Sequence, residues 1–167
     1  MAWVFAYGSL MGDNALRAYP AHSALIRGYH RAFNHFSRGR WGTKERACPI
    51  LGLSPGGECW GLAFDVPRQE EKEVLRQLNR REASDERMRI EASVELAAGA
   101  VSAWVWVSRE AHRAPTSASH SDLARALEQC RGAVGTGVEY VRTMVHAMEL
   151  HGIKDPVVES LWAELRP

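Results

Sequence analysis

One amphipathic helix places the strongest local constraint on this chain. Arg68–Glu82 has helical composition, and Pro67 precedes it where a first-turn proline is tolerated. Its glutamates come first and its arginines last, which suits the helix dipole. At about 100° per residue, Val74, Leu75 and Leu78 form one narrow apolar stripe. We therefore expect a helix that buries this face.

Glu82 falls on the same stripe if the helix extends that far. An ionised carboxylate on a buried face costs several kcal/mol unless it has a partner, a raised pKa or a function. Glu82 could pair with an arginine just beyond the helix end, or it could serve a catalytic purpose. Spacing alone favours the ion pair.

The other segments predict further strands and helices. Gly61 suggests a bulge or a close backbone approach. The tetrapeptide Ser54–Gly57 is a hairpin signal, Leu10–Asn14 predicts a loop, and Ser121 is the expected cap of a helix. The expected strands cover residues 2–7, 24–37, 48–53, 57–66, 87–96 and 101–108, and the expected helices cover residues 121–130, 138–151 and 156–165.

Composition indicates an ordinary soluble protein with a single domain over residues 1–167. Hydrophobic residues make up 46% and charged residues 25% of the chain, and the net charge is +1. A near-neutral chain has no general attraction for nucleic acid or membrane. Residues 22–46 are locally basic and aromatic. They could form a rim for an anionic small molecule or a solvated strand face, and nucleic-acid binding is not favoured.

The cysteines and histidines indicate neither a disulfide framework nor a metal site. Cys48, Cys59 and Cys130 are odd in number and form no CxxC pair, which predicts reduced thiols in a cytoplasmic protein. The seven histidines show no HxxxH spacing. No apolar run approaches the ~20 residues of a membrane span, and the N-terminus lacks the features of a secretory signal. The sequence does not indicate an oligomeric state.

A glycine–serine bend follows the first predicted strand. The backbone N–H groups at Gly8 and Ser9 could cradle an anion or a developing oxyanion. By itself this pattern is most simply a turn. No G-x-S-x-G elbow surrounds Ser9, so a hydrolase triad is not supported.

Five segments, taken together and in order, resemble the ChaC-type, glutathione-specific branch of the γ-glutamylcyclotransferases. The resemblance spans nearly the whole chain and is more specific than any one motif. The segments are Tyr7-Gly8-Ser9-Leu10, Arg27-Gly28-Tyr29 with Arg31 and Phe33, Trp60-Gly61-Leu62-Ala63-Phe64, Leu78-Asn79-Arg80-Arg81-Glu82, and Gly132…Gly135…Glu139-Tyr140.

The resemblance implies an α+β fold, a small mixed β-barrel with surrounding helices. It also implies the cyclisation of a γ-glutamyl group, as in glutathione, to 5-oxoproline with release of an amine or Cys-Gly. Neither a metal nor a cofactor is required. Glu82 becomes the expected acid/base catalyst, its pKa raised by a partly apolar setting. The expected substrate-binding residues are Tyr7, Gly8, Ser9, Leu10, Arg31 and Tyr140, with Arg31 as a partner for a second carboxylate.

Two positions depart from the family pattern. Ala83-Ser84-Asp85 stands where the family commonly has Gly-Gly-Tyr, and Gly137 replaces an asparagine. Both lie near the expected substrate, so they bear on substrate choice more than on reaction type. The alternatives are cyclotransfer on other γ-glutamyl amines or amino acids, and a non-catalytic domain that binds small anions.

Overall fold

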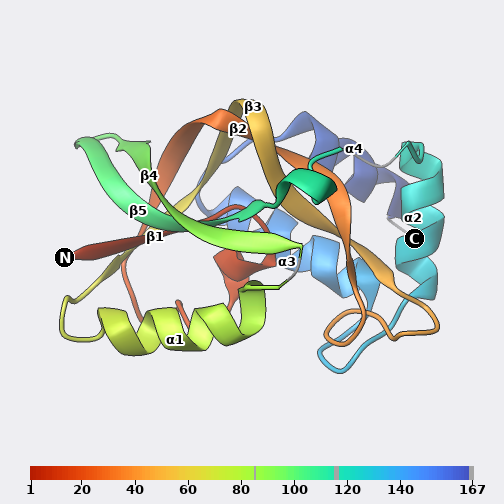
Figure 1. The fold of residues 1–167 in the computed structure, drawn as a ribbon. Helices are drawn as coiled ribbons and strands as arrows, with labels where there is room; N and C mark the ends of the chain where they lie inside the picture. The colour runs from red at the N-terminus through yellow and green to blue at the C-terminus, as the bar shows by residue number, and fades with distance from the viewer. Residues whose placement is uncertain (85, 115–116, 166–167) are drawn as a thin grey trace.

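The computed structural model describes residues 1–84, 86–114 and 117–165. In this part of the chain the strands close into a barrel in the order β1-β3-β2-β4-β5, and helices surround it (Figure 1). The predicted α+β fold with a small mixed barrel is confirmed. The strands are β1 (Ala2–Ala6), β2 (Ala21–Ser37), β3 (Cys48–Val66), β4 (Arg87–Leu96) and β5 (Gly99–Ser108).

Strand β1 closes the barrel and determines where the chain leaves it. It runs antiparallel to β3 and parallel to β5. Val4, Phe5 and Ala6 are all buried, although neighbouring side chains of a strand point to opposite faces. Both faces of β1 are therefore covered, and residues 7–10 emerge at one end of the barrel.

The predicted hairpin at residues 54–57 is wrong. Strand β3 is continuous from Cys48 to Val66 and pairs antiparallel with β2 along its length. Gly56 and Gly57 have positive φ angles, and the register with β2 shifts opposite them, between Arg27 and Tyr29. The glycines therefore mark an irregularity at which the strand pair bends without reversing.

Gly61 lies on β3 beside the end of β1. A Cβ atom there would stand 2.3 Å from the Ala6 carbonyl oxygen and 2.8 Å from the Phe5 ring. The register with β2 is regular at this point, so the close approach predicted for Gly61 is correct and the alternative of a bulge is not. The absence of a side chain lets β1 and β3 approach where the chain turns toward residues 7–10.

The helices lie on different sides of the barrel. α1 (Glu71–Glu82) packs by itself along one side and buries Val74, Leu75 and Leu78, as the periodicity predicts (Figure 1). α2, α3 and α4 pack against one another, with α2 and α4 at the right of the same view and α3 across its middle. Their bounds are α2 (His120–Gln129), α3 (Gly137–Leu150) and α4 (Pro156–Leu165), and the 3-10 turns are η1 (Ser9–Gly12) and η2 (Glu110–His112).

Capping side chains account for small differences from the expected helix limits. Ser119, and not Ser121, caps α2, and its partner Asp122 completes a capping box. Thr136 and Glu139 form the same motif at the start of α3. Part of the predicted loop Leu10–Asn14 belongs instead to η1.

The prediction of reduced thiols is contradicted at two of the three cysteines. Cys48 and Cys130 form a disulfide between residues 82 positions apart. The start of β3 and the end of α2 bring them together, which neither the odd count nor the spacing could reveal. Cys59 is free and buried, and burial raises the pKa of its thiol to about 11. The cysteines therefore do not indicate a reducing compartment.

None of the helices in the described ranges has the length and apolar character needed to cross a bilayer.

Candidate active site

A cavity of about 430 Å³ opens at the end of the barrel where β1 leaves it. Six of the seven residues expected at the site line this cavity. They are Tyr7, Gly8, Ser9, Leu10, Glu82 and Tyr140. The structure thus brings together the turn after β1, the end of α1 and one face of α3.

Glu82 is the last residue of α1, and its side chain is only 12% exposed. Its Oε1 atom lies 2.7 Å from Nε of Arg81, and its Oε2 atom lies 2.9 Å from Nη1 of Arg87. Both interpretations of Glu82 made from the sequence therefore apply at once. The carboxylate pairs with arginines, and it lines a cavity large enough for a small ligand.

Arg81 joins the end of α1 to the turn after β1. One of its terminal nitrogens pairs with the Asp13 carboxylate, and the other lies 3.3 Å from the Ser9 hydroxyl oxygen. Because the same guanidinium also contacts Glu82, the acid and the glycine–serine turn are held at a fixed separation.

Arg87 begins β4, lines the cavity and contacts the Glu82 carboxylate oxygen that Arg81 does not. Its second terminal nitrogen donates to the Leu51 carbonyl oxygen at 2.8 Å. The guanidinium therefore links α1, β3 and β4 around the acid. Neighbouring Tyr7 is buried, and this burial raises the pKa of its phenol well above the usual range despite the positive charge of Arg87.

Tyr140 places a neutral phenol at the cavity wall. Its oxygen accepts a hydrogen bond from the Leu51 backbone N–H at 2.8 Å. Burial raises the pKa of Tyr140 to about 12, so it keeps its proton at neutral pH and can donate it to a ligand. A Cβ atom on Gly8 would lie 3.8 Å from this oxygen, which places the phenol directly against the turn.

The structure does not bring Arg31 to the cavity. Its side chain is 4% exposed and pairs with Asp155 at 2.7 Å. Its Nε donates to the Tyr7 carbonyl oxygen at 2.6 Å, and a terminal nitrogen contacts the Trp60 carbonyl. Arg31 therefore fixes the backbone at Tyr7 from outside the cavity.

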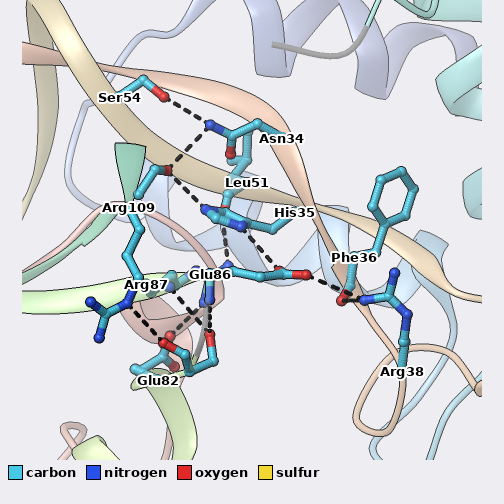
Figure 2. Close-up of polar contacts among 12 residues, drawn as sticks. Asn34, His35, Phe36, Arg38, Leu51, Ser54, Glu82, Glu86, Arg87 and Arg109 are labelled. Atoms are coloured by element: carbon cyan, nitrogen blue, oxygen red, sulfur yellow. Dashed lines mark hydrogen bonds and ion pairs between the residues drawn. The ribbon is translucent and has the colours of Figure 1, made fainter. Parts of the chain in front are cut away.

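A buried polar network beside the cavity was not predicted from the sequence. His35 contacts Glu86 through Nδ1 at 3.1 Å and Ser108 through Nε2 at 2.8 Å (Figure 2). Glu86, which lines the cavity, also accepts from Arg38 at 3.3 Å. Asn34 extends the network by donating to the Ser108 hydroxyl at 3.2 Å. The sequence signal for this network was the position of His35 on the predicted strand 24–37.

Burial keeps His35 neutral. Loss of solvation, assisted by the nearby positive charge of Arg87, lowers the pKa of His35 from 6.5 to about 4. A neutral ring satisfies both contacts if Nδ1–H donates to Glu86 and Nε2 accepts from the Ser108 hydroxyl. Partial burial raises the pKa of Glu86, but the hydrogen bonds donated by His35 and Arg38 outweigh it and lower this pKa overall.

We expect this network to make the protein less stable in mild acid. The unfolded chain binds a proton on His35 near pH 6.5, whereas the folded chain does so only near pH 4. The free energy of unfolding should therefore fall as the pH drops through this window, by about 1–2 kcal/mol between pH 7 and pH 5. Glu86, with its lowered pKa, adds a loss only at still lower pH.

Urea unfolding at several pH values measures this effect. His35→Gln should flatten the dependence between pH 7 and pH 5. His120→Gln, which removes an imidazole from an exposed position at the start of α2, should leave it as in the wild type. Equal slopes for wild type and His35→Gln would contradict the assignment.

No group of three or more His, Cys, Asp or Glu side chains that could hold a metal ion occurs among the residues with described positions. The first departure from the family pattern is Ala83-Ser84-Asp85, and its Ser84 lines the cavity. Asp85 lies outside the described residues. Gly137 packs tightly, since a Cβ atom there would stand 2.4 Å from the Leu127 carbonyl oxygen.

A family model and known proteins match almost the whole of this chain. The family model described as ChaC-like protein matches residues 2–166. The chain is 26% identical to a glutathione-specific γ-glutamylcyclotransferase of Escherichia coli K12, covering 98% of this chain and 72% of the relative. It is 27% identical to glutathione-specific γ-glutamylcyclotransferase 1 of Danio rerio, covering 98% and 88%. A crystal structure of a γ-glutamylcyclotransferase specific to glutathione from yeast superposes with a TM-score of 0.84 at 19% identity, covering 98% and 95%.

The structural likeness supports the fold, and the family match extends over almost every residue of the barrel, the helices and the cavity. The chain therefore belongs to the ChaC-like protein family.

Proposed function

We propose that this protein is a γ-glutamylcyclotransferase that converts glutathione to 5-oxoproline and Cys-Gly. The observation that carries this proposal is the position of Glu82, whose carboxylate lines an accessible cavity together with residues 7–10. The two relatives described above carry the same activity in their names.

The reaction closes a five-membered lactam within one molecule. The α-amine of the γ-glutamyl group attacks its own γ-carbonyl carbon, a new C–N bond forms, and the original amide C–N bond breaks. Glu82 accepts the proton that the amine must lose and delivers it to the departing nitrogen. Acid–base assistance of this kind contributes about 10²–10⁴-fold to the rate.

Negative charge develops on the γ-carbonyl oxygen during attack. The backbone N–H groups of Gly8, Ser9 and Leu10 are the proposed donors to this oxygen or to the α-carboxylate of the substrate. Tyr140 supplies a further O–H donor, because its oxygen already accepts from Leu51 and its proton remains free to donate. Holding both ends of the γ-glutamyl group in a folded conformer can contribute ~7–11 kcal/mol.

The arginine contacts of Glu82 favour a second candidate. Two guanidinium groups contact the carboxylate, one at each oxygen, so both oxygens that could take a proton are already engaged. A cavity of the same shape could bind a γ-glutamyl ligand without turning it over. For catalysis, substrate binding must loosen one of these contacts.

Product analysis separates the two candidates. The purified protein is incubated with glutathione, γ-glutamyl-alanine and ε-(γ-glutamyl)-lysine, and 5-oxoproline and the released amine are quantified. We expect equimolar 5-oxoproline and Cys-Gly from glutathione, with slower release from the other two. Tight calorimetric binding of glutathione without product would support the binding domain instead, and faster turnover of another substrate would reassign the leaving group.

A further inference from the structure

The cavity is lined by more arginines than carboxylates. Four guanidinium groups face two acids within the described ranges. The arginines are Arg38, Arg40, Arg81 and Arg87, and the acids are Glu82 and Glu86. Asp13 lies outside the lining but contacts two of the four arginines. Even with Asp13 included, positive charge remains in excess.

Three of the four arginines have close partners. Arg81 pairs with Glu82 at 2.7 Å and with Asp13, and Arg87 pairs with Glu82 at 2.9 Å. Arg38 pairs with Glu86 at 3.3 Å, and Figure 2 shows this contact at the end of the His35 network. These three guanidinium groups are therefore already engaged in ion pairs within the protein.

Arg40 differs from the other three. Its nearest carboxylate is Asp13 at 3.8 Å, and Asp13 is already paired with Arg81. Its Nε atom is buried and has no hydrogen-bond partner among the residues with described positions, while the side chain as a whole remains 42% exposed. The guanidinium thus has an unused donor at the buried Nε and only a long contact at one terminal nitrogen, on a side chain that is partly open to a ligand.

The backbone at Arg40 is firmly held. Its carbonyl oxygen accepts from the Val134 N–H at 2.8 Å, and a Cβ atom on Gly132 would stand 2.4 Å from that oxygen. Burial and the nearby charge of Arg81 lower the pKa of Arg40 by more than the carboxylates of Asp13 and Glu82 raise it. These causes describe a cation short of negative charge, which an incoming anion would relieve.

We infer that Arg40 binds the terminal carboxylate of the leaving peptide and so selects γ-glutamyl substrates that carry such a group. The inference rests on the proposed function. The α-carboxylate is attached to the carbon that bears the attacking amine, so it must stay near Glu82 and residues 7–10. The far carboxylate of a γ-glutamyl dipeptide lies two residues beyond the scissile bond, about 7 Å in an extended chain.

Two features make Arg40 suited to that second carboxylate. A guanidinium binds a carboxylate through two parallel N–H donors, and it does so most effectively when partly removed from water. Arg40 also comes from the segment between β2 and β3, whereas Glu82 comes from α1. The cavity therefore offers one anchor at the reacting end and another on a different element.

The experiment compares glutathione with its terminal carboxamide, an isosteric substrate without the second carboxylate. We expect the wild type to prefer glutathione by ~10-fold or more in kcat/KM, the range of a charge-assisted hydrogen bond. Arg40→Gln should reduce this preference to within ~3-fold, chiefly by raising KM for glutathione. Arg46→Gln, which removes an arginine of the same segment that does not line the cavity, should keep the wild-type preference.

Calorimetric binding of the two compounds gives a second readout that does not need turnover. A wild-type preference for glutathione that Arg40→Gln abolishes, in binding or in rate, supports the inference. Equal binding and turnover of acid and amide by the wild type, or an unchanged preference in Arg40→Gln, overturns it while leaving the cyclotransferase proposal intact. Selective binding without any 5-oxoproline would reject the cyclotransferase activity and still assign Arg40 to the carboxylate.

Discussion

Glu82→Gln should lower kcat for 5-oxoproline release from glutathione by about 10²–10⁴-fold, the usual value of a positioned acid–base group. Glutamine has nearly the same shape and can still accept from Arg81 or Arg87, so the cavity should keep its form. It cannot take the proton of the attacking amine. We therefore expect the loss in kcat, with a smaller change in KM.

Glu73→Gln provides the matched control for this experiment. Glu73 lies on the same helix but is 52% exposed and bonded to Arg76 and Gln77 on the solvent side. Its replacement should leave kcat unchanged. Near-wild-type turnover by a correctly folded Glu82→Gln protein would rule out Glu82 as the acid–base group.

Arg31→Met should destabilise the protein by about 3–5 kcal/mol, because removing one member of a buried ion pair leaves the other charge uncompensated. The substitution would strand the Asp155 carboxylate and the carbonyl oxygens of Tyr7 and Trp60. For a chain of this size each kcal/mol corresponds to ~2–4 °C in Tm. Thermal and urea unfolding measure the effect.

Arg27→Met serves as the control on the same strand. Arg27 is 61% exposed and pairs with Glu58 and Glu95, so its loss should cost no more than about 1 kcal/mol. The opposite result would support the contact with a second substrate carboxylate that the family resemblance implied for Arg31. If Arg31→Met kept its stability and raised KM for substrates with a second carboxylate, Arg31 would contact substrate after all.

Local patterns predicted the elements well because they depend on residues that are close in sequence. The stripe of Val74, Leu75 and Leu78 placed α1, and alternating apolar residues placed β4. The hairpin at residues 54–57 failed for the opposite reason. Its glycines carry a strong turn signal, but pairing with β2 on both sides of them holds β3 as one strand.

The site was predictable only where family motifs cover it. Those motifs identified Glu82, the turn at residues 7–10 and Tyr140. They did not identify Arg87 or Asp13, whose roles depend on how the start of β4 and the end of η1 meet α1 in space. The pairing of Cys48 with Cys130 and the contact between His35 and Glu86 likewise join residues far apart in sequence.

The parallel pairing of β1 with β5 has a consequence for the order of folding. Trp3 and Val4 find their neighbours at Ala103 and Trp104, so the ring of strands stays open until about two thirds of the polypeptide has collapsed. Closing so long a loop is slow compared with forming a local helix. We therefore expect the end of the barrel from which residues 7–10 emerge to close only after the intervening strands have formed.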